Sequence, residues 1–208
     1  MISISMSNTK MGCVPSFSLM PVVTCNKLMP CTSKGCYAAK IARIRKSVAK
    51  AWKNNTTICQ HDLSLFKGQM IGWLTMYQPQ AFRIHVGGDF FSVKYLLAWC
   101  DIAERFPKVK FFAFTKQYNV LRSVNYIPKN LSIILSAWLP SEFKVWLPPK
   151  DLRKRFPVAW IINKDGSMSN EVAKYLSNKN DVCLGNCETC GLCFKRKKKD
   201  GDIVFYKH

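Results

Sequence analysis

Long apolar runs are missing from this 208-residue sequence, and no apolar segment stands near its amino end. The longest strongly apolar stretches, such as Ile133 to Leu139, are much shorter than the roughly 20 residues that a membrane-spanning helix needs. Residues Met1 to Met11 are polar and lack the apolar centre of a signal peptide. We therefore expect a protein that stays in the cytoplasm where it is made and has no membrane partner.

Acidic residues are scarce: 12 Asp and Glu stand against 32 Lys and Arg, a net charge of +20. The sequence shows no pair of catalytic carboxylates, no Ser–His–Asp set and no phosphate-binding loop, which argues against ordinary hydrolysis. The basic excess favours a polyanionic partner, of which nucleic acid is the commonest. A generic basic surface is the alternative, because no RNP, helix-turn-helix or zinc-finger signature is present.

Disulfides are not expected for the ten cysteines, because clustered thiols in a reducing cytoplasm usually bind metal. Four of them form the carboxyl-terminal group Cys183-x3-Cys187-x2-Cys190-x2-Cys193. This close spacing is typical of iron–sulfur loops, whereas structural zinc usually takes two separated CxxC pairs. We predict a [4Fe–4S] cluster at this group, with zinc as the alternative metal.

Three more cysteines form the amino-terminal group Cys25-x5-Cys31-x4-Cys36, which leads into a predicted helix. Three ligands on a four-iron cluster leave one iron open, and an open metal position is typical of a reactive site. The alternative is that one or two of these residues are ordinary buried thiols. With both groups considered, the chain is expected to hold one or two [4Fe–4S] clusters.

Helices and strands alternate over most of the chain, which predicts an α/β fold with parallel strands. The predicted helices cover Tyr37 to about Trp52, Asp62 to Tyr77 and Ser92 to Phe106, with short pieces near Tyr118 to Val124 and around Ser141 to Val145 or Asp151 to Lys154. The predicted strands cover Ala81 to Val86, Lys110 to Phe114, Leu131 to Ala137, Pro157 to Ile162 and Ile203 to Tyr206. The first 36 residues are predicted to be a loop.

Polar residues follow four of these strands at their carboxyl ends: Gly88-Asp89, Thr115-Lys116, Ser136 and Asn163. Because parallel strands end at one edge of a sheet, we expect the functional site at that edge. Asp89 either anchors the amine of a ligand or caps the next helix. Lys116 either binds a phosphate or carboxylate or is a solvated lysine.

Two further features have alternative interpretations. His85 lies inside a predicted strand and is expected to be a core histidine and not a ligand. The basic run Lys195 to Lys199 is either a solvated tail or a phosphate-facing patch. The net charge of the chain favours the patch.

Several short motifs follow one another along the chain: Phe17-Ser18-Leu19…Thr24-Cys25, Cys36-Tyr37-Ala38, Arg83-Ile84-His85…Gly88-Asp89-Phe90, Tyr95…Ala98-Trp99, Phe112-Ala113-Phe114-Thr115-Lys116 and Cys193-Phe194. In this order they resemble the phage protein family called gene product 88. The resemblance covers most of the chain. It implies a phage protein, which would act in the cytoplasm of the host.

That family is similar, more remotely, to radical S-adenosylmethionine enzymes, which are partial (β/α) barrels. The resemblance implies that Cys25, Cys31 and Cys36 hold a [4Fe–4S] cluster, whose fourth iron binds the methionine end of S-adenosylmethionine. Those enzymes usually separate the cysteines by three and two residues, whereas the spacers here are five and four.

The same resemblance implies a cofactor pocket at the strand ends. Its members would be Gly87, Gly88 and Asp89, at the position that binds the amino group of the cofactor, together with Thr115, Lys116 and Ser136. Asp89 and Lys116 are the candidate catalytic residues. The cluster would pass an electron, received from a donor protein, to the cofactor, and the carbon radical released would abstract hydrogen from a substrate.

We therefore expect a partial (β/α) barrel domain over residues 1–180 and a cysteine-rich metal-binding tail over residues 181–208, packed on the same domain. The expected function is that of an iron–sulfur enzyme which cleaves S-adenosylmethionine to modify a substrate, with nucleic acid as the candidate. The alternative is a non-enzymatic basic protein that binds nucleic acid and whose fold is held together by bound metal.

Overall fold

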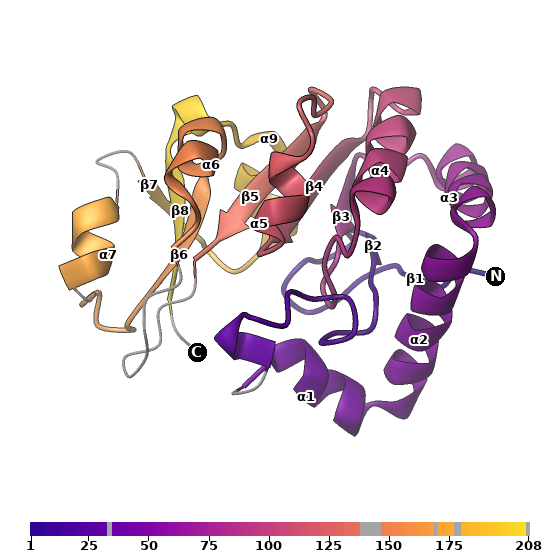
Figure 1. The fold of residues 1–208 in the computed structure, drawn as a ribbon, viewed down its shortest axis with the longest axis horizontal. Helices are drawn as coiled ribbons and strands as arrows, with labels where there is room; N and C mark the ends of the chain where they lie inside the picture. The colour runs from indigo at the N-terminus through magenta and orange to yellow at the C-terminus, as the bar shows by residue number, and fades with distance from the viewer. Residues whose placement is uncertain (33–34, 138–146, 169, 177–179, 207–208) are drawn as a thin grey trace.

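The computed structural model describes residues 1–32, 35–137, 147–168, 170–176 and 180–206. These residues form an eight-stranded sheet in the order β1-β2-β3-β4-β5-β6-β8-β7 (Figure 1). The strands are β1 (Ile4–Ser5), β2 (Ser16–Phe17), β3 (Ala81–Ile84), β4 (Lys110–Thr115), β5 (Leu131–Ser136), β6 (Val158–Ile162), β7 (Asn180–Val182) and β8 (Asp202–Tyr206). Strand β1 is antiparallel to β2, and every other neighbouring pair is parallel. The predicted α/β fold with parallel strands is therefore confirmed, and the partial barrel stays a prediction.

The helices connect these strands. They are α1 (Tyr37–Ile44), α2 (Lys46–His61), α3 (Leu63–Tyr77), α4 (Val93–Arg105), α5 (Tyr118–Arg122), α6 (Lys150–Arg155), α7 (Asn170–Tyr175), α8 (Cys187–Cys190) and α9 (Leu192–Lys195), with 3-10 turns η1 (Pro30–Thr32) and η2 (Lys198–Asp200). None of the helices within the described ranges combines the length and the apolar character that a membrane span requires.

Most predicted elements occur within one or two residues of their predicted bounds. The single helix expected from Tyr37 to about Trp52 is wrong, because Arg45 adopts an extended backbone with φ −105° and ψ 93° and separates α1 from α2. Ile44, the last residue of α1, is 63% exposed. The amino-terminal loop contains two short strands that were not predicted. Helix α6 confirms the piece at Asp151 to Lys154, and the alternative at Ser141 to Val145 lies outside the described residues.

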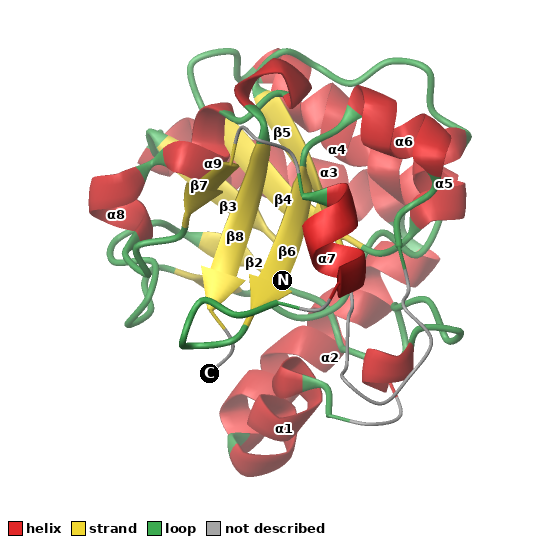
Figure 2. Ribbon diagram, turned by 90° about the vertical axis from the view of Figure 1, so that its left-hand side faces the viewer, coloured by secondary structure: helices red, strands yellow, loops and turns green. Residues whose placement is uncertain are grey.

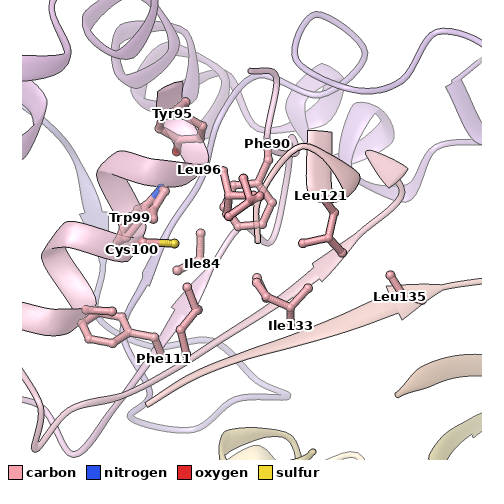
Figure 3. Packing of buried hydrophobic residues seen from close by; sticks show 14 of the residues in the cluster. Ile84, Phe90, Tyr95, Leu96, Trp99, Cys100, Phe111, Leu121, Ile133 and Leu135 are labelled. Atoms are coloured by element: carbon pink, nitrogen blue, oxygen red, sulfur yellow. The ribbon is translucent and has the colours of Figure 1, made fainter. Parts of the chain in front are cut away.

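Helices α3 to α6 cover one face of the sheet and enclose the main core. Figure 3 shows α4 projecting Tyr95, Leu96 and Trp99 toward Ile84 of β3 and Phe111 of β4. All five side chains are fully buried. Burial of each such side chain stabilises the fold by roughly 1.5–3 kcal/mol, so this core fixes β3 and β4 side by side.

The opposite face of the sheet is covered by the cysteine-rich segment. In Figure 2, α8 and α9 lie on one side of the sheet and α4, α5 and α6 on the other. Phe194 of α9 packs on Phe112 of β4 with ring centroids 4.8 Å apart. Cys187 and Cys193 contact the same apolar cluster. The carboxyl-terminal segment is therefore an outer layer of the fold.

Candidate metal centres and the strand-end site

The loop that carries the amino-terminal cysteines docks on the carboxyl ends of β3 and β4. Thr24 is its anchor: its hydroxyl donates to the Met20 carbonyl at 2.8 Å and accepts from the Asp89 amide at 3.3 Å. Gln117, just past β4, donates from Nε2 to the Thr24 carbonyl at 3.2 Å. These contacts hold Cys25, the next residue, close to the predicted functional edge of the sheet.

The three thiols of this group lie close enough to influence one another. Burial raises the pKa of Cys25 to about 12, with further contributions from Asp89, Cys36 and Cys31. Burial likewise raises the pKa of Cys31, and the positive charge of Lys116 opposes that rise. Without metal these two thiols are therefore protonated at neutral pH, and a metal that binds them must displace their protons.

Cys36 contributes a different feature, because it is the N-cap of α1. Its sulfur accepts a hydrogen bond from the Ala39 amide at 3.4 Å. The amino end of a helix favours negative charge on such a group. A thiolate ligand at this position is thus supported by the helix that follows it.

Asp89 is buried and ties β3 to β4. Its Oδ1 accepts from the Thr115 hydroxyl at 2.7 Å and from the Phe90 amide at 2.8 Å, and its Oδ2 accepts from the Lys116 amide at 2.8 Å. Burial raises the pKa of Asp89, and these three hydrogen bonds oppose the rise. Ser92 is the N-cap of α4, so the prediction that Asp89 caps this helix is wrong.

The two glycines before Asp89 are required by packing within the chain. A Cβ on Gly87 would lie 2.7 Å from the Trp52 ring. Gly88 has φ +81°, in the left-handed region, and a Cβ there would lie 2.6 Å from the Leu19 Cβ. Gly87 thus leaves room for Trp52 of α2, and Gly88 lets the loop between β2 and α1 approach the end of β3.

The remaining predicted pocket residues lie along the same edge. Thr115 ends β4, and its strand neighbour on β5 is Leu135, the residue before Ser136. The Ser136 carbonyl accepts from the Tyr118 hydroxyl at 2.6 Å. The structure therefore brings the predicted residues of β3, β4 and β5 to one edge, beside the amino-terminal cysteines.

The carboxyl-terminal cysteines gather on the other face of the sheet. Cys183 follows β7, Cys187 and Cys190 belong to α8, and Cys193 belongs to α9. Burial raises the pKa of Cys193 to about 12, and the other three cysteines of the group raise it further. The Cys187 amide donates to the Lys10 carbonyl at 3.0 Å, which attaches α8 to the amino-terminal segment.

Arg83 is the cation of this second group, and it was not predicted as a site residue. It lies on β3 between two fully buried residues that face the helices, so its side chain points to the cysteine-rich face. Its guanidinium lies 5.4 Å from the Phe114 ring centroid. Burial raises the pKa of Cys187 and of Cys193, and the positive charge of Arg83 opposes both rises. Among the described residues no carboxylate pairs with it. The alternation of side chains along β3 was the signal that could have identified it.

His85 is buried, which confirms the prediction of a core histidine. Its Nε2 lies 2.9 Å from the Tyr95 hydroxyl, and burial next to Arg83 lowers its pKa to about 3. The imidazole is therefore neutral at physiological pH and is a hydrogen-bonding member of the core.

Over the described ranges, no three His, Cys, Asp or Glu side chains are arranged to hold a single metal ion. What the structure provides is the mutual proximity of the thiols within each group. The ligand sets at both groups therefore stay predictions.

Comparison with known proteins gives a family but no activity. The family model described as Gene product 88 matches residues 3–196. The Gene 88 protein of Mycobacterium phage D29 is 27% identical over 186 residues, which is 80% of this chain and 76% of that protein. The Gene 88 protein of Mycobacterium phage L5 is 31% identical over 93 residues, which is 40% of this chain and 39% of that protein. No solved structure matches the chain.

Proposed function

We propose that this chain, which belongs to the gene product 88 family of phage proteins, is an iron–sulfur enzyme that uses S-adenosylmethionine in the manner of radical enzymes. One observation carries the proposal: the amino-terminal cysteines lie with Asp89 and Lys116 at the carboxyl edge of a parallel sheet. Sites of α/β enzymes lie at this edge. In this proposal the sheet is a partial barrel over residues 1–180, and residues 181–208 are a cluster-binding segment.

The amino-terminal group fits a cluster with one open iron. Three thiols interact, and the helix that begins after Cys36 favours a thiolate there. When bound, the cluster supplies one-electron chemistry at the iron that has no protein ligand. The chain's own part is to hold the three sulfurs and to keep water from them, which the partial burial of all three supports.

Asp89 and Lys116 would orient the amino acid end of S-adenosylmethionine. Oδ2 of Asp89 accepts one hydrogen bond from the protein, so it retains capacity for an ammonium donor. Lys116 carries the opposite charge at the same strand end and suits the carboxylate of the cofactor. Gly88 acts indirectly, because it allows the cysteine loop to approach Asp89, and Gly87 leaves room for Trp52.

The carboxyl-terminal group fits a second, closed cluster. A cubane held by four thiolates carries net negative charge, and burial of negative charge requires a nearby cation. Arg83 supplies that cation without a competing carboxylate among the described residues. We propose that this cluster relays electrons from a donor protein or shapes the substrate site.

The first test is anaerobic purification followed by measurement of iron, sulfide and zinc. About eight irons per chain are expected, and about four should remain when Cys25, Cys31 and Cys36 are all replaced by alanine. Cys13→Ser is the control, because Cys13 is an exposed thiol outside both groups. Addition of S-adenosylmethionine should perturb the electron paramagnetic resonance spectrum of the reduced wild-type protein but not that of the triple variant. A colourless protein that contains zinc would refute the proposal.

A second candidate is a non-enzymatic, metal-stapled protein that binds nucleic acid. The observation that favours it is the position of the cysteine-rich segment, which packs as an outer layer of the sheet as structural metal segments do. It predicts zinc or an inert cluster, and nucleic-acid binding that is unchanged by Asp89→Asn. A spectral response to S-adenosylmethionine would exclude it.

A further inference from the structure

A pocket of about 480 Å³ lies on the helix-covered side of the sheet, away from both cysteine groups. Lys150, Arg153 and Lys154 of α6 form one wall, and Lys198 forms another. Its floor lies at the amino ends of β6 and β8, where Val158 and Asp202 begin their strands. We call it the basic pocket. Its volume lies within the range of ordinary ligand sites.

The basic pocket has a net positive charge. Four cations line it, against one carboxylate, Asp202. That carboxylate is 2% exposed and accepts from the Val158 amide at 3.0 Å, from Trp160 Nε1 at 2.9 Å and from Lys198 Nζ at 3.1 Å. Because Asp202 pairs with Lys198, the charge offered to a ligand is that of Lys150, Lys154 and Arg153.

Arg153 is held in place by an aromatic ring. Its guanidinium lies 4.6 Å from the ring centroid of Tyr175, which also lines the pocket. Its Nε is buried and has no hydrogen-bond partner among the described residues. A guanidinium anchored on a ring suits an anion with several acceptor oxygens, and a phosphate group is such an anion.

The acidic side chain next to this wall does not compete for the cations of the pocket. Asp151 pairs with Arg122, with Oδ1 and Nη2 2.6 Å apart. Lys198 belongs to the basic run Lys195 to Lys199, and its neighbour Lys199 is exposed. An extended polyanion would contact both the pocket and Lys199.

We propose that the basic pocket binds a backbone phosphate of a nucleic-acid strand. The inference rests on the proposed function in one respect, since it names the class of partner on which this protein acts. The contacts that support it do not involve either cysteine group. Binding of the strand and binding of iron can therefore fail separately.

The test measures how tightly the 208-residue chain binds a fluorescent single-stranded oligothymidylate of about 20 nucleotides. Binding is followed by fluorescence anisotropy at salt concentrations between about 50 and 200 mM. Lys150→Glu with Lys154→Glu reverses two exposed charges, one helical turn apart, on the wall of the pocket. Lys46→Glu with Lys50→Glu is the matched control, with the same spacing, exposure and charge change on α2.

The pocket pair should weaken binding at least about tenfold and lower the salt slope by roughly 0.7, the contribution of the one single-strand phosphate that the pocket holds. The control pair should weaken binding less than about threefold. Equal effects of the two pairs, or wild-type binding by the pocket pair, would overturn the inference. If circular dichroism shows that the pocket pair is unfolded, Lys150→Gln with Lys154→Gln replaces it.

Two further measurements separate a strand from a free phosphate as the ligand, and this inference from the proposed iron–sulfur function. Thymidine monophosphate should compete poorly with the strand, and competition at equal affinity would overturn a strand as the ligand. Iron is measured on the same preparation. Iron without strand binding overturns this inference alone, and strand binding without iron overturns the proposed iron–sulfur enzyme alone.

Discussion

The pH dependence of stability should reverse its sign when metal binds, and Cys25 is the residue that shows it most clearly. Burial raises its pKa from 9.0 to about 12 in the metal-free fold. Between these pH values the folded chain keeps a proton that the unfolded chain has lost. The contribution of Cys25 is therefore complete below pH 9.0 and declines as the pH rises toward about 12. The decline is about 1.4 kcal/mol of unfolding free energy per pH unit.

If Cys25 binds metal as proposed, it is a thiolate in the metal-loaded fold, whereas the unfolded chain protonates it below pH 9.0. The folded state then binds fewer protons than the unfolded state. Stability should consequently rise with pH up to about 9 and stay level above it, as far as Cys25 is concerned. The metal-loaded form should thus gain stability as the pH rises to about 9, and the metal-free form should lose stability as the pH rises above about 9.

Urea unfolding of metal-free protein, followed by circular dichroism between pH 9 and about 11, measures the slope. Cys25→Ser should make the decline shallower by about 1.4 kcal/mol per pH unit. Cys100 is the matched control, because burial also raises its pKa to about 12 but it belongs to neither group. Cys100→Ser should change the slope equally with and without metal. An unchanged slope in metal-free Cys25→Ser would refute the reasoning.

Three further substitutions test other parts of the structure. Asp89→Asn should lower the unfolding free energy by about 2–4 kcal/mol in urea titrations, because the amide nitrogen of Asn would face the Lys116 amide. An unchanged midpoint would contradict the role of Asp89 as a link between β3 and β4. Gly88→Ala should cost a similar amount, about 2–4 kcal/mol, and reduce iron loading at the amino-terminal group, whereas Gly72→Ala, in open space on α3, should do neither. Arg83→Met should lower the reduction potential of the second cluster by roughly 50–100 mV in redox titrations, whereas Arg83→Lys should restore most of it.

The sequence predicted the regular part of the fold well, because strands β3 to β6 are apolar runs of four to six residues with polar ends. It missed β1 and β2, which are two residues each and are defined by pairing and not by a pattern. The sequence also predicted one helix in place of α1 and α2, because the apolar spacing continues across Arg45, whereas the helical backbone is interrupted there.

For the site, the sequence predicted which residues meet at the strand ends, but not what they contact. Asp89 was given two roles, and the structure shows a third, a link between adjacent strands. Such a link joins residues that are far apart in sequence, and no local pattern reports it. The side-chain alternation along β3 indicates which face Arg83 points to, but not that it faces cysteines about a hundred positions away.

The position of β8 has a consequence for the order in which the protein folds. This strand is the last along the sequence, yet it lies inside the sheet, between β6 and β7. Strand β7 pairs with β8 alone among the described strands, so during synthesis it has no partner until residues 202–206 have left the ribosome. The four carboxyl-terminal cysteines are made between these two strands, and they should gather only after β8 has inserted. Assembly of this group would thus depend on a late, long-range step that is slow compared with local folding.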